Sequence, residues 1–349
     1  MPCARPIATL CRHLWRILRP QVLMLLTLSC AYAFDGANPP GRTGSQALSF
    51  GVLPLSGPLE SRRDWQPLID EMGTAIGQPI RMLSVTSYEA LEAAIQRQEV
   101  DIAFLSGKMT LNAVTQHGMR VIAQVTRDDG LPGYRAVLLA RRGGPVTREN
   151  LYESPGRWRL ARGSDLSMSG YVVPHLQLFL PHGIQPERYF LSETIATHQD
   201  NALAVANGEA DLATNNTADL ERFRSRFPAE YEQLEVLWES ELIPHAQIVV
   251  RSQLPSTLRH SIARFLLHYG QSPTPESERQ RKVLQQLHGF AGFLPADGQS
   301  LESTASINHA LARQSALKSQ WVSTQALQER LRRLDDAHQA LLQQLRSEP

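Results

Sequence analysis

The stretch "GSDLSMSGYVVP" at 163–174 carries Ser167 and Ser169, and Gly170 stands directly before an apolar, helix-like run. The N-terminus of a helix exposes unpaired N–H groups and a partial positive charge. Small residues at that point let an anion approach the backbone, and serine hydroxyls add hydrogen-bond donors. These residues therefore either cap the helix in the ordinary way or form a cradle for a tetrahedral oxyanion such as phosphate or phosphonate.

Hydrolysis by a serine nucleophile fits this stretch poorly. The nucleophile elbow of hydrolases reads G-x-S-x-G, which "GSDLSMSG" does not match, and one serine with His198 is a weak pair. The sequence contains no H-E-x-x-H metal motif and no glycine-rich nucleotide loop. We expect a binding protein without catalysis, cofactor or metal.

The elements that must position this loop alternate in type along the chain. Strand-like and helix-like segments follow one another at 47–55, 61–77, 79–85, 87–98 and 100–105. This order predicts a mostly parallel α/β sheet, in which ligands bind outside the carboxyl ends of the strands.

The pattern restarts after residue 120, which predicts a second α/β block. Strands are expected at 120–127, 134–142 and 245–252, and the quoted loop leads into a helix at 169–183. The tail at 324–349 reads as a long, charged amphipathic helix with leucines near heptad spacing. This helix is compatible with packing on its own domain or with forming a homodimer.

The first 33 residues predict a secretory signal peptide. Four arginines precede the short apolar core "QVLMLLTLSC", and "AYA" matches a cleavage site after Ala33, with an uncleaved anchor as the alternative. Cleavage would change the formal charge from +1 to −3 and remove all three cysteines. Disulfides, thiolate sites and a nucleic-acid partner are then not expected. Residues 34–46 read as a flexible lead-in.

The quoted loop resembles the D-P-x-S-x-S-G signature of the PhnD-like family, the periplasmic phosphonate-binding proteins of ABC transporters. "VDIAFLSG", "DGLPGY", "THQDNALAVANGEADLATNN" and "LWESELIP" resemble the same family in the same order. The resemblance implies a two-lobed, type II periplasmic binding protein, in which each lobe is a mixed sheet flanked by helices, with a long C-terminal helix. Lobe one would then comprise 47–139 and 250–349, and lobe two 140–249, with hinges near 138–142 and 247–251.

The resemblance also implies which residues hold the ligand. Lobe one would contribute two phenolic donors, the cradle would contribute hydroxyls and backbone N–H groups, and a histidine would reach the oxyanion. Met168 stands where the family often has threonine, so that one hydroxyl is lost while the N–H remains. The implied set is Tyr88, Tyr134, Ser167, Met168, Ser169 and His198.

The sequence departs from the family at the other end of the site. Members that bind aminoethylphosphonate hold its ammonium with two carboxylates, and here those positions are Ala218 and Ala246. Asp219, Glu241 or His245 are the nearby candidates to substitute. We expect the phosphonate end to be kept and the amine end lost, which leaves phosphate or phosphite, an uncharged phosphonate, or a larger organophosphonate as ligands.

The resemblance implies a binding protein that captures a phosphorus oxyanion in the cleft between the lobes. It would deliver this ligand to a membrane permease of an ABC transporter. The alternative is a sensory protein of the same fold that presents its ligand to a membrane receptor or kinase.

Overall fold

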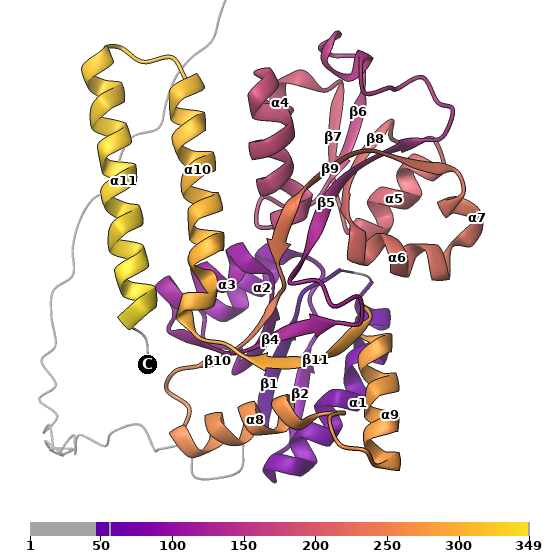
Figure 1. Cartoon of the computed structure of the whole chain (residues 1–349), viewed down its shortest axis with the longest axis vertical. Helices are drawn as coiled ribbons and strands as arrows, with labels where there is room; N and C mark the ends of the chain where they lie inside the picture. The colour runs from indigo at the N-terminus through magenta and orange to yellow at the C-terminus, as the bar shows by residue number, and fades with distance from the viewer. Residues whose placement is uncertain (1–46, 56, 348–349) are drawn as a thin grey trace, which may run out of the picture. The chain divides into compact units, whose positions relative to one another are not determined.

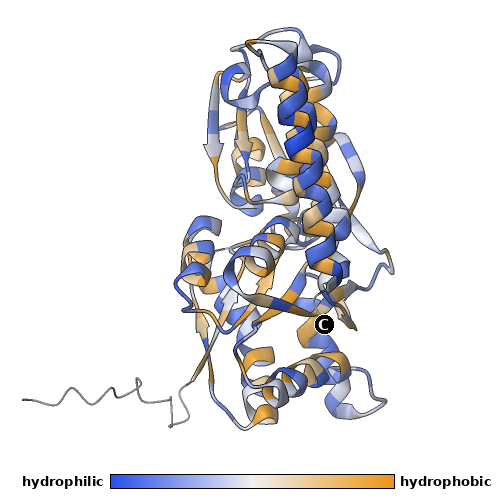
Figure 2. Ribbon diagram, turned by 90° about the vertical axis from the view of Figure 1, so that its left-hand side faces the viewer, coloured by the Kyte–Doolittle hydropathy of each residue, from blue (hydrophilic) through white to orange (hydrophobic). Residues whose placement is uncertain are grey.

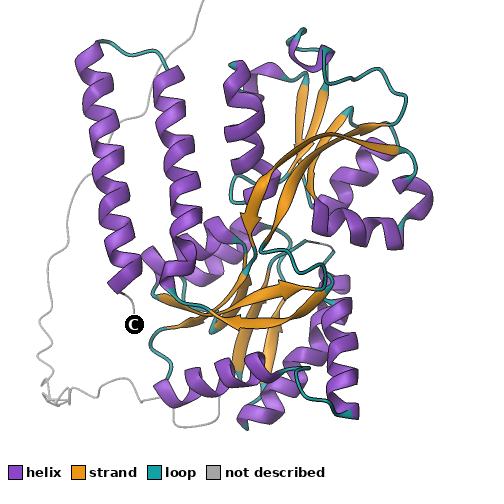
Figure 3. Ribbon diagram, viewed as in Figure 1, coloured by secondary structure: helices purple, strands orange, loops and turns teal. Residues whose placement is uncertain are grey.

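The computed structural model describes residues 47–55 and 57–347 of the chain. Its strands form two sheets, each flanked by helices (Figures 1 and 3). The predicted signal peptide (1–33) and lead-in (34–46) lie outside the described residues.

The first sheet has six strands in the order β11-β4-β10-β3-β1-β2. β1 pairs in parallel with β2 and β3, whereas β10 and β11 run antiparallel to their neighbours. The strands are β1 Leu48–Val52, β2 Ile80–Leu83, β3 Ile102–Leu105, β4 Met119–Arg127, β10 Gln247–Arg251 and β11 Phe290–Pro295. The parallel part corresponds to the strand–helix alternation expected from the sequence, and the antiparallel strands make the sheet mixed.

The second sheet has five strands in the order β7-β6-β8-β5-β9. β6 pairs in parallel with β7 and β8, and β5 runs antiparallel to β8 and β9. The strands are β5 Gly133–Arg141, β6 Arg159–Arg162, β7 Ser192–Ile195, β8 Leu212–Asn216 and β9 Leu234–Pro244. Both sheets are therefore mixed, as the predicted fold class requires.

Helices of the first sheet help to bury an aromatic core. Trp65 of α1 contacts Phe104 with ring centroids 4.8 Å apart, and Phe104 contacts Phe290 at 5.7 Å. Burying an aromatic side chain contributes about 1.5–3 kcal/mol, so this core stabilises the packing of α1 on β3 and β11. The helices are α1 Pro58–Ile76, α2 Tyr88–Gln96, α3 Gly107–His117, α8 Ser256–His268 and α9 Pro275–Gln286.

The second sheet is covered on both faces, which explains the uninterrupted apolar run in β5. Val137 and Leu139 belong to one buried cluster, and Leu138 and Ala140 belong to another. A strand with two buried faces carries no polar alternation. The helices of this half are α4 Pro186–Tyr189, α5 His198–Ala206, α6 Thr217–Arg226 and α7 Pro228–Tyr231, with π-helical turns at Met168–Val172 and His175–Phe179. Short 3₁₀ turns occur at Asn150–Tyr152, Leu180–His182 and Gly298–Leu301.

The chain passes between the two sheets at 128–132, between β4 and β5, and at 245–246, between β9 and β10. The expected hinges at 138–142 and 247–251 instead lie largely within β5 and β10, and the expected lobe boundaries fall inside the same strands. His245 Nε2 donates to the Leu131 carbonyl at 3.0 Å, which joins the two crossing segments.

The last two helices form a hairpin, α10 Glu302–Lys318 and α11 Thr324–Ser347. Ile307 and Leu311 of α10 pack on the cluster that contains Met168 and Val172. Hydrophilic residues predominate on the side of α11 that faces the viewer in Figure 2, and Leu345 is its fully buried residue. The formation of a homodimer through α11 stays a prediction. Across 47–55 and 57–347, no helix is both long and apolar enough to cross a membrane.

Candidate ligand-binding site

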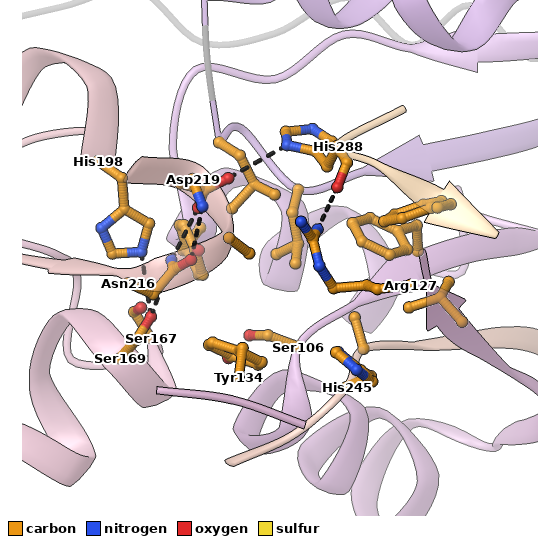
Figure 4. A pocket seen from close by; sticks show the side chains of 18 residues that line it. Ser106, Arg127, Tyr134, Ser167, Ser169, His198, Asn216, Asp219, His245 and His288 are labelled. Atoms are coloured by element: carbon orange, nitrogen blue, oxygen red, sulfur yellow. Dashed lines mark hydrogen bonds and ion pairs between the residues drawn. The ribbon is translucent and has the colours of Figure 1, made fainter. Parts of the chain in front are cut away.

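A small cavity lies where the two sheets meet (Figure 4). Its volume is about 60 Å³. Residues from both sheets line it: Leu53, Leu55, Tyr88, Phe104, Ser106, Val125, Arg127, Tyr134, Ser167, Ser169, His198, Asn216, Ala218, Asp219, His245, Ala246, His288 and Phe290. Five of the six expected ligand residues are in this set, and Met168 is not.

The cradle loop begins the π-helical turn after β6. Ser167 Oγ accepts a hydrogen bond from the Gly170 N–H at 2.9 Å, so Ser167 does cap the helix. The Ser167 carbonyl accepts from the N–H groups of Tyr171 and Val172 at 3.2 and 3.1 Å, which widens the first turn to a π-turn. The cap uses the oxygen of Ser167 as an acceptor, and its O–H remains a donor that meets the Tyr88 hydroxyl at the cavity, so the two roles left open by the sequence are compatible.

Two glycines allow the cradle to close on itself. A Cβ on Gly170 would lie 2.7 Å from Gly163 Cα and 2.8 Å from Ser167 Oγ. The Gly170 carbonyl accepts from Thr214 Oγ1 at 2.7 Å, which ties the loop to β8. Glycine at 170 is therefore required by the close approach of two backbone segments.

Met168 serves the cradle through its side-chain packing. Its side chain is fully buried in the cluster of Ala136, Val172, Val173 and Ile243, away from the cavity. The expected contribution of Met168 to the ligand is thus restricted to its backbone N–H at the start of the π-turn. An apolar residue fits this position because the side chain points into the core.

Ser169 lies in a network of side chains from three elements. Its Oγ is 3.3 Å from His198 Nε2, and Asn216 Nδ2 donates to it at 3.3 Å. His198 is the first residue of α5, after the cap Thr197, and is 4% exposed. Burial lowers the pKa of His198, against the charge of Asp219 and the Thr214 backbone, which raise it. Burial therefore favours a neutral His198.

The two tyrosines lie on different elements. Tyr88 begins α2 next to the first sheet, whereas Tyr134 lies in β5 of the second sheet and not in lobe one as expected. Burial, and then the charge of Asp219, raise the pKa of both phenols. Both hydroxyls therefore stay protonated and able to donate at neutral pH. The Tyr134 ring also stacks on His245, with centroids 6.1 Å apart.

The positions that the resemblance assigns to the amine end are filled by the two alanines, and both line the cavity. Ala218 and Ala246 are joined in the lining by apolar side chains such as Leu53 and Phe290. Of the three candidate substitutes for the missing acids, Asp219 and His245 line the cavity, and Glu241 is an exposed residue of β9.

Sequence reasoning missed several lining residues. Asn216, Arg127 and His288 were not singled out, and neither was Ser106, whose buried Oγ has no hydrogen-bond partner among the described residues. Ser106 follows β3 and stands directly before α3, so the rule applied to the quoted loop would have found it in "FLSG". His288 carried no local signal, because it meets the cavity from a loop 69 residues away from Asp219.

Residues 50–301 match the family described as the periplasmic substrate-binding protein of phosphonate ABC transporters. The chain is also 31% identical over 249 residues to the phosphonates-binding periplasmic protein of Escherichia coli K12, covering 71% of this chain and 72% of that protein. The chain belongs to this family. It is accordingly a transporter substrate-binding protein and not an enzyme, and the resemblance seen in the sequence is confirmed.

Solved structures agree with the fold. A binding-protein component of an ABC phosphonate transporter from Pseudomonas aeruginosa aligns with a TM-score of 0.80 and 26% identity, covering 86% of this chain and 97% of that chain. PhnD1 from Prochlorococcus marinus in complex with methylphosphonate aligns with a TM-score of 0.66 and 17% identity, covering 77% and 99%. The predicted two-lobed, type II fold is thereby confirmed.

Proposed function

We propose that the protein captures a phosphonate, or a related phosphorus oxyanion such as phosphite or phosphate, in the cavity between the two sheets. The main support is the set of donors that converge on this cavity: Ser167, Ser169, Tyr88, Tyr134 and His198. They come from both sheets and from separate helix N-termini, which is the arrangement that binds an oxyanion through neutral donors. The loaded protein would deliver its ligand to an ABC permease in the inner membrane.

The tail end of the cavity favours a small ligand without an ammonium group. An ammonium against Ala218 and Ala246 would lose its hydration without gaining a counter-ion from these two positions, which costs several kcal/mol. The nearby carboxylate of Asp219 already accepts hydrogen bonds from His288 and Asn216. The volume of about 60 Å³ suits a ligand of few atoms, and the neighbouring apolar side chains suit a methyl or similar tail. These features favour an uncharged phosphonate or a small oxyanion over aminoethylphosphonate.

Polar contacts between the two halves support capture by closure around the ligand. Arg226 of α6 pairs with Glu60 of α1 at 2.6 Å, and Arg222 pairs with Asp64. Lys108 Nζ donates to the Asp165 carbonyl at 2.8 Å on the cradle loop. We propose that the crossings at 128–132 and 245–246 act as hinges and that these contacts form on closure.

The transport role also requires export, which we assign to residues 1–33 as a signal peptide cleaved after Ala33. Membership of a transporter family favours delivery to a permease over the sensory alternative. Sequencing the N-terminus of the protein recovered from the periplasm tests the cleavage. An intact leader in the membrane fraction would instead favour a sensor.

Calorimetric titration of the mature protein, unfolded and refolded to remove carried-over ligand, tests the binding proposal. We expect tight binding of methylphosphonate, phosphite or phosphate, and weak binding of aminoethylphosphonate. Tight aminoethylphosphonate binding would show that another group holds the ammonium. Failure to bind any of the four would refute the proposed ligand class.

A further inference from the structure

Asp219 places a carboxylate inside the cavity, next to the proposed oxyanion cradle. It is the third residue of α6, and its side chain is 12% exposed. Its Oδ1 accepts from His288 Nδ1 at 3.1 Å, and its Oδ2 accepts from Asn216 Nδ2 at 2.8 Å. Figure 4 shows Asp219 between His198 and His288 at the cavity.

The hydrogen bonds of His288 identify which of its nitrogens carries the proton. An Arg222 guanidinium N–H donates to His288 Nε2 at 2.8 Å, so that nitrogen must be the acceptor. His288 Nδ1 then holds the proton and donates it to Asp219. Burial and the charge of Arg222 lower the pKa of His288, in agreement with a neutral ring. The partner of Asp219 is therefore a neutral donor.

Asp219 nevertheless stays ionised. Burial by itself raises its pKa, but the hydrogen bonds that it accepts from His288 and Asn216 oppose burial and hold the pKa well below its usual range, and the charge of His288 or His198 would lower it further if either ring were protonated. The N-terminus of α6 adds a favourable partial positive charge. The cavity thus contains a fixed anion at neutral pH.

The other charged and titratable groups facing Asp219 come from several elements. Tyr88 and Tyr134 feel its charge and stay neutral, and burial favours neutral His198. Arg222 pairs with Asp64, and Arg127 donates to the His288 carbonyl and lies 3.6 Å from Asp129. Among the hydrogen bonds and ion pairs of the described residues, none of these groups forms a cationic contact with the side of Asp219 that faces the cavity.

A carboxylate only accepts hydrogen bonds, and so does a fully deprotonated phosphonate oxygen. Two such groups side by side in a buried cavity repel each other, and neither satisfies the other. Building on the function proposed above, we propose that Asp219 accepts a hydrogen bond from a protonated ligand oxygen. The site then selects the singly charged P–OH form of a phosphonate and discriminates against anions that carry no proton.

Methylphosphonate and methanesulfonate form the probe pair for this proposal. At low pH both are monoanions of the same shape, but only the phosphonate carries an O–H. We expect wild-type affinity for methylphosphonate to fall about tenfold per pH unit above the second pKa of the ligand, because only the protonated form binds. Methanesulfonate should bind at least about 100-fold more weakly at low pH, because its oxygen leaves Asp219 without a donor.

The variant Asp219→Asn should remove both effects. An amide can donate to a ligand oxygen and still accept from His288, but its NH2 group replaces the oxygen that accepts from Asn216 Nδ2. We expect a flatter pH profile for methylphosphonate, and methanesulfonate affinity within about tenfold of it. Asp219→Ser provides a second neutral variant if the asparagine variant folds poorly. Glu221→Gln is the matched control, since it removes a carboxylate that is 67% exposed on the same helix and should change neither effect.

The outcomes separate this proposal from its alternatives. If the affinity for methanesulfonate also falls as pH rises, His198 rather than the ligand is titrating, and the proposal is overturned. Equal binding of the two probes by the wild type overturns it as well. Failure of the wild type to bind methylphosphonate, phosphite or phosphate would refute the proposed function itself.

Discussion

The two ends of the cavity are built by different means. At the cradle, Ser167 and Ser169 are fixed by a helix cap, by a π-turn and by two glycines in close backbone contact. At the tail end, Ala218 and Ala246 stand beside apolar side chains and make no polar side-chain contact. The cradle is set by backbone geometry and tolerates little change, whereas the tail end can be altered by exchanging a side chain. This difference predicts that exchanging side chains at the tail end changes ligand selectivity without disturbing the cradle.

The largest effect is expected where two backbones touch. Gly170→Ala would place Cβ 2.7 Å from Gly163 Cα, which no side-chain rotation relieves. Overpacking of this kind costs about 1–3 kcal/mol of the free energy of unfolding, and the displaced cap would remove most oxyanion binding. Thermal melting and calorimetric titration measure the two losses.

Gly57→Ala is the matched control for that variant. Gly57 has φ −58°, and a Cβ there meets nothing within 4 Å. It should bind ligand and melt as the wild type does. If Gly170→Ala behaved in the same way, the close approach would not define the cradle.

The first alternating elements of the chain were accessible to sequence reasoning because each has a clear period. Trp65, Leu68 and Met72 share one helical face and are all buried, as expected. The lobe boundary was less accessible, because the central run of β5 at 136–140 is apolar throughout and gives no sign of which sheet it joins. Its place became visible only from its pairing with β8 and β9.

The candidate site divides in a similar way. Ser167, Ser169 and His198 follow local rules for helix starts, and the structure brings them to one cavity. Asp219 was noted only as a substitute for a missing acid, since its partner His288 comes from a distant loop. A pattern read along the chain does not contain such a pairing.

Within the cradle, Ser169→Ala should give the next largest loss. The hydroxyl lies between His198 and Asn216 and is proposed to donate to the ligand. Removing one hydrogen bond to an anion should weaken binding by about 1–3 kcal/mol. Titration with methylphosphonate measures the loss, and Ser306→Ala on the exposed side of α10 serves as control. Unchanged affinity would remove Ser169 from the proposed site.

Restoring the acids at the other end tests whether the tail end can be exchanged by itself. Ala218→Glu together with Ala246→Asp should raise the affinity for aminoethylphosphonate at least about tenfold, a gain of about 1.4 kcal/mol, by supplying counter-ions to its ammonium. The neutral pair Ala218→Gln with Ala246→Asn has similar size and should give little gain. Equal gains from both double variants would attribute the effect to shape instead of charge.

The smallest effect is expected for Tyr134→Phe. The ring can keep its stacking on His245, so the change removes the phenolic hydroxyl together with its hydrogen bond to Ser169. We expect a loss of about 0.5–1.5 kcal/mol in methylphosphonate binding and an unchanged melting temperature. Competition titration against the wild type can resolve a loss of this size. A drop in melting temperature with full affinity would instead give Tyr134 a structural role beside the crossing segments, where His245 donates to the Leu131 carbonyl. The donors to the head group would then be the cradle loop, His198 and Tyr88.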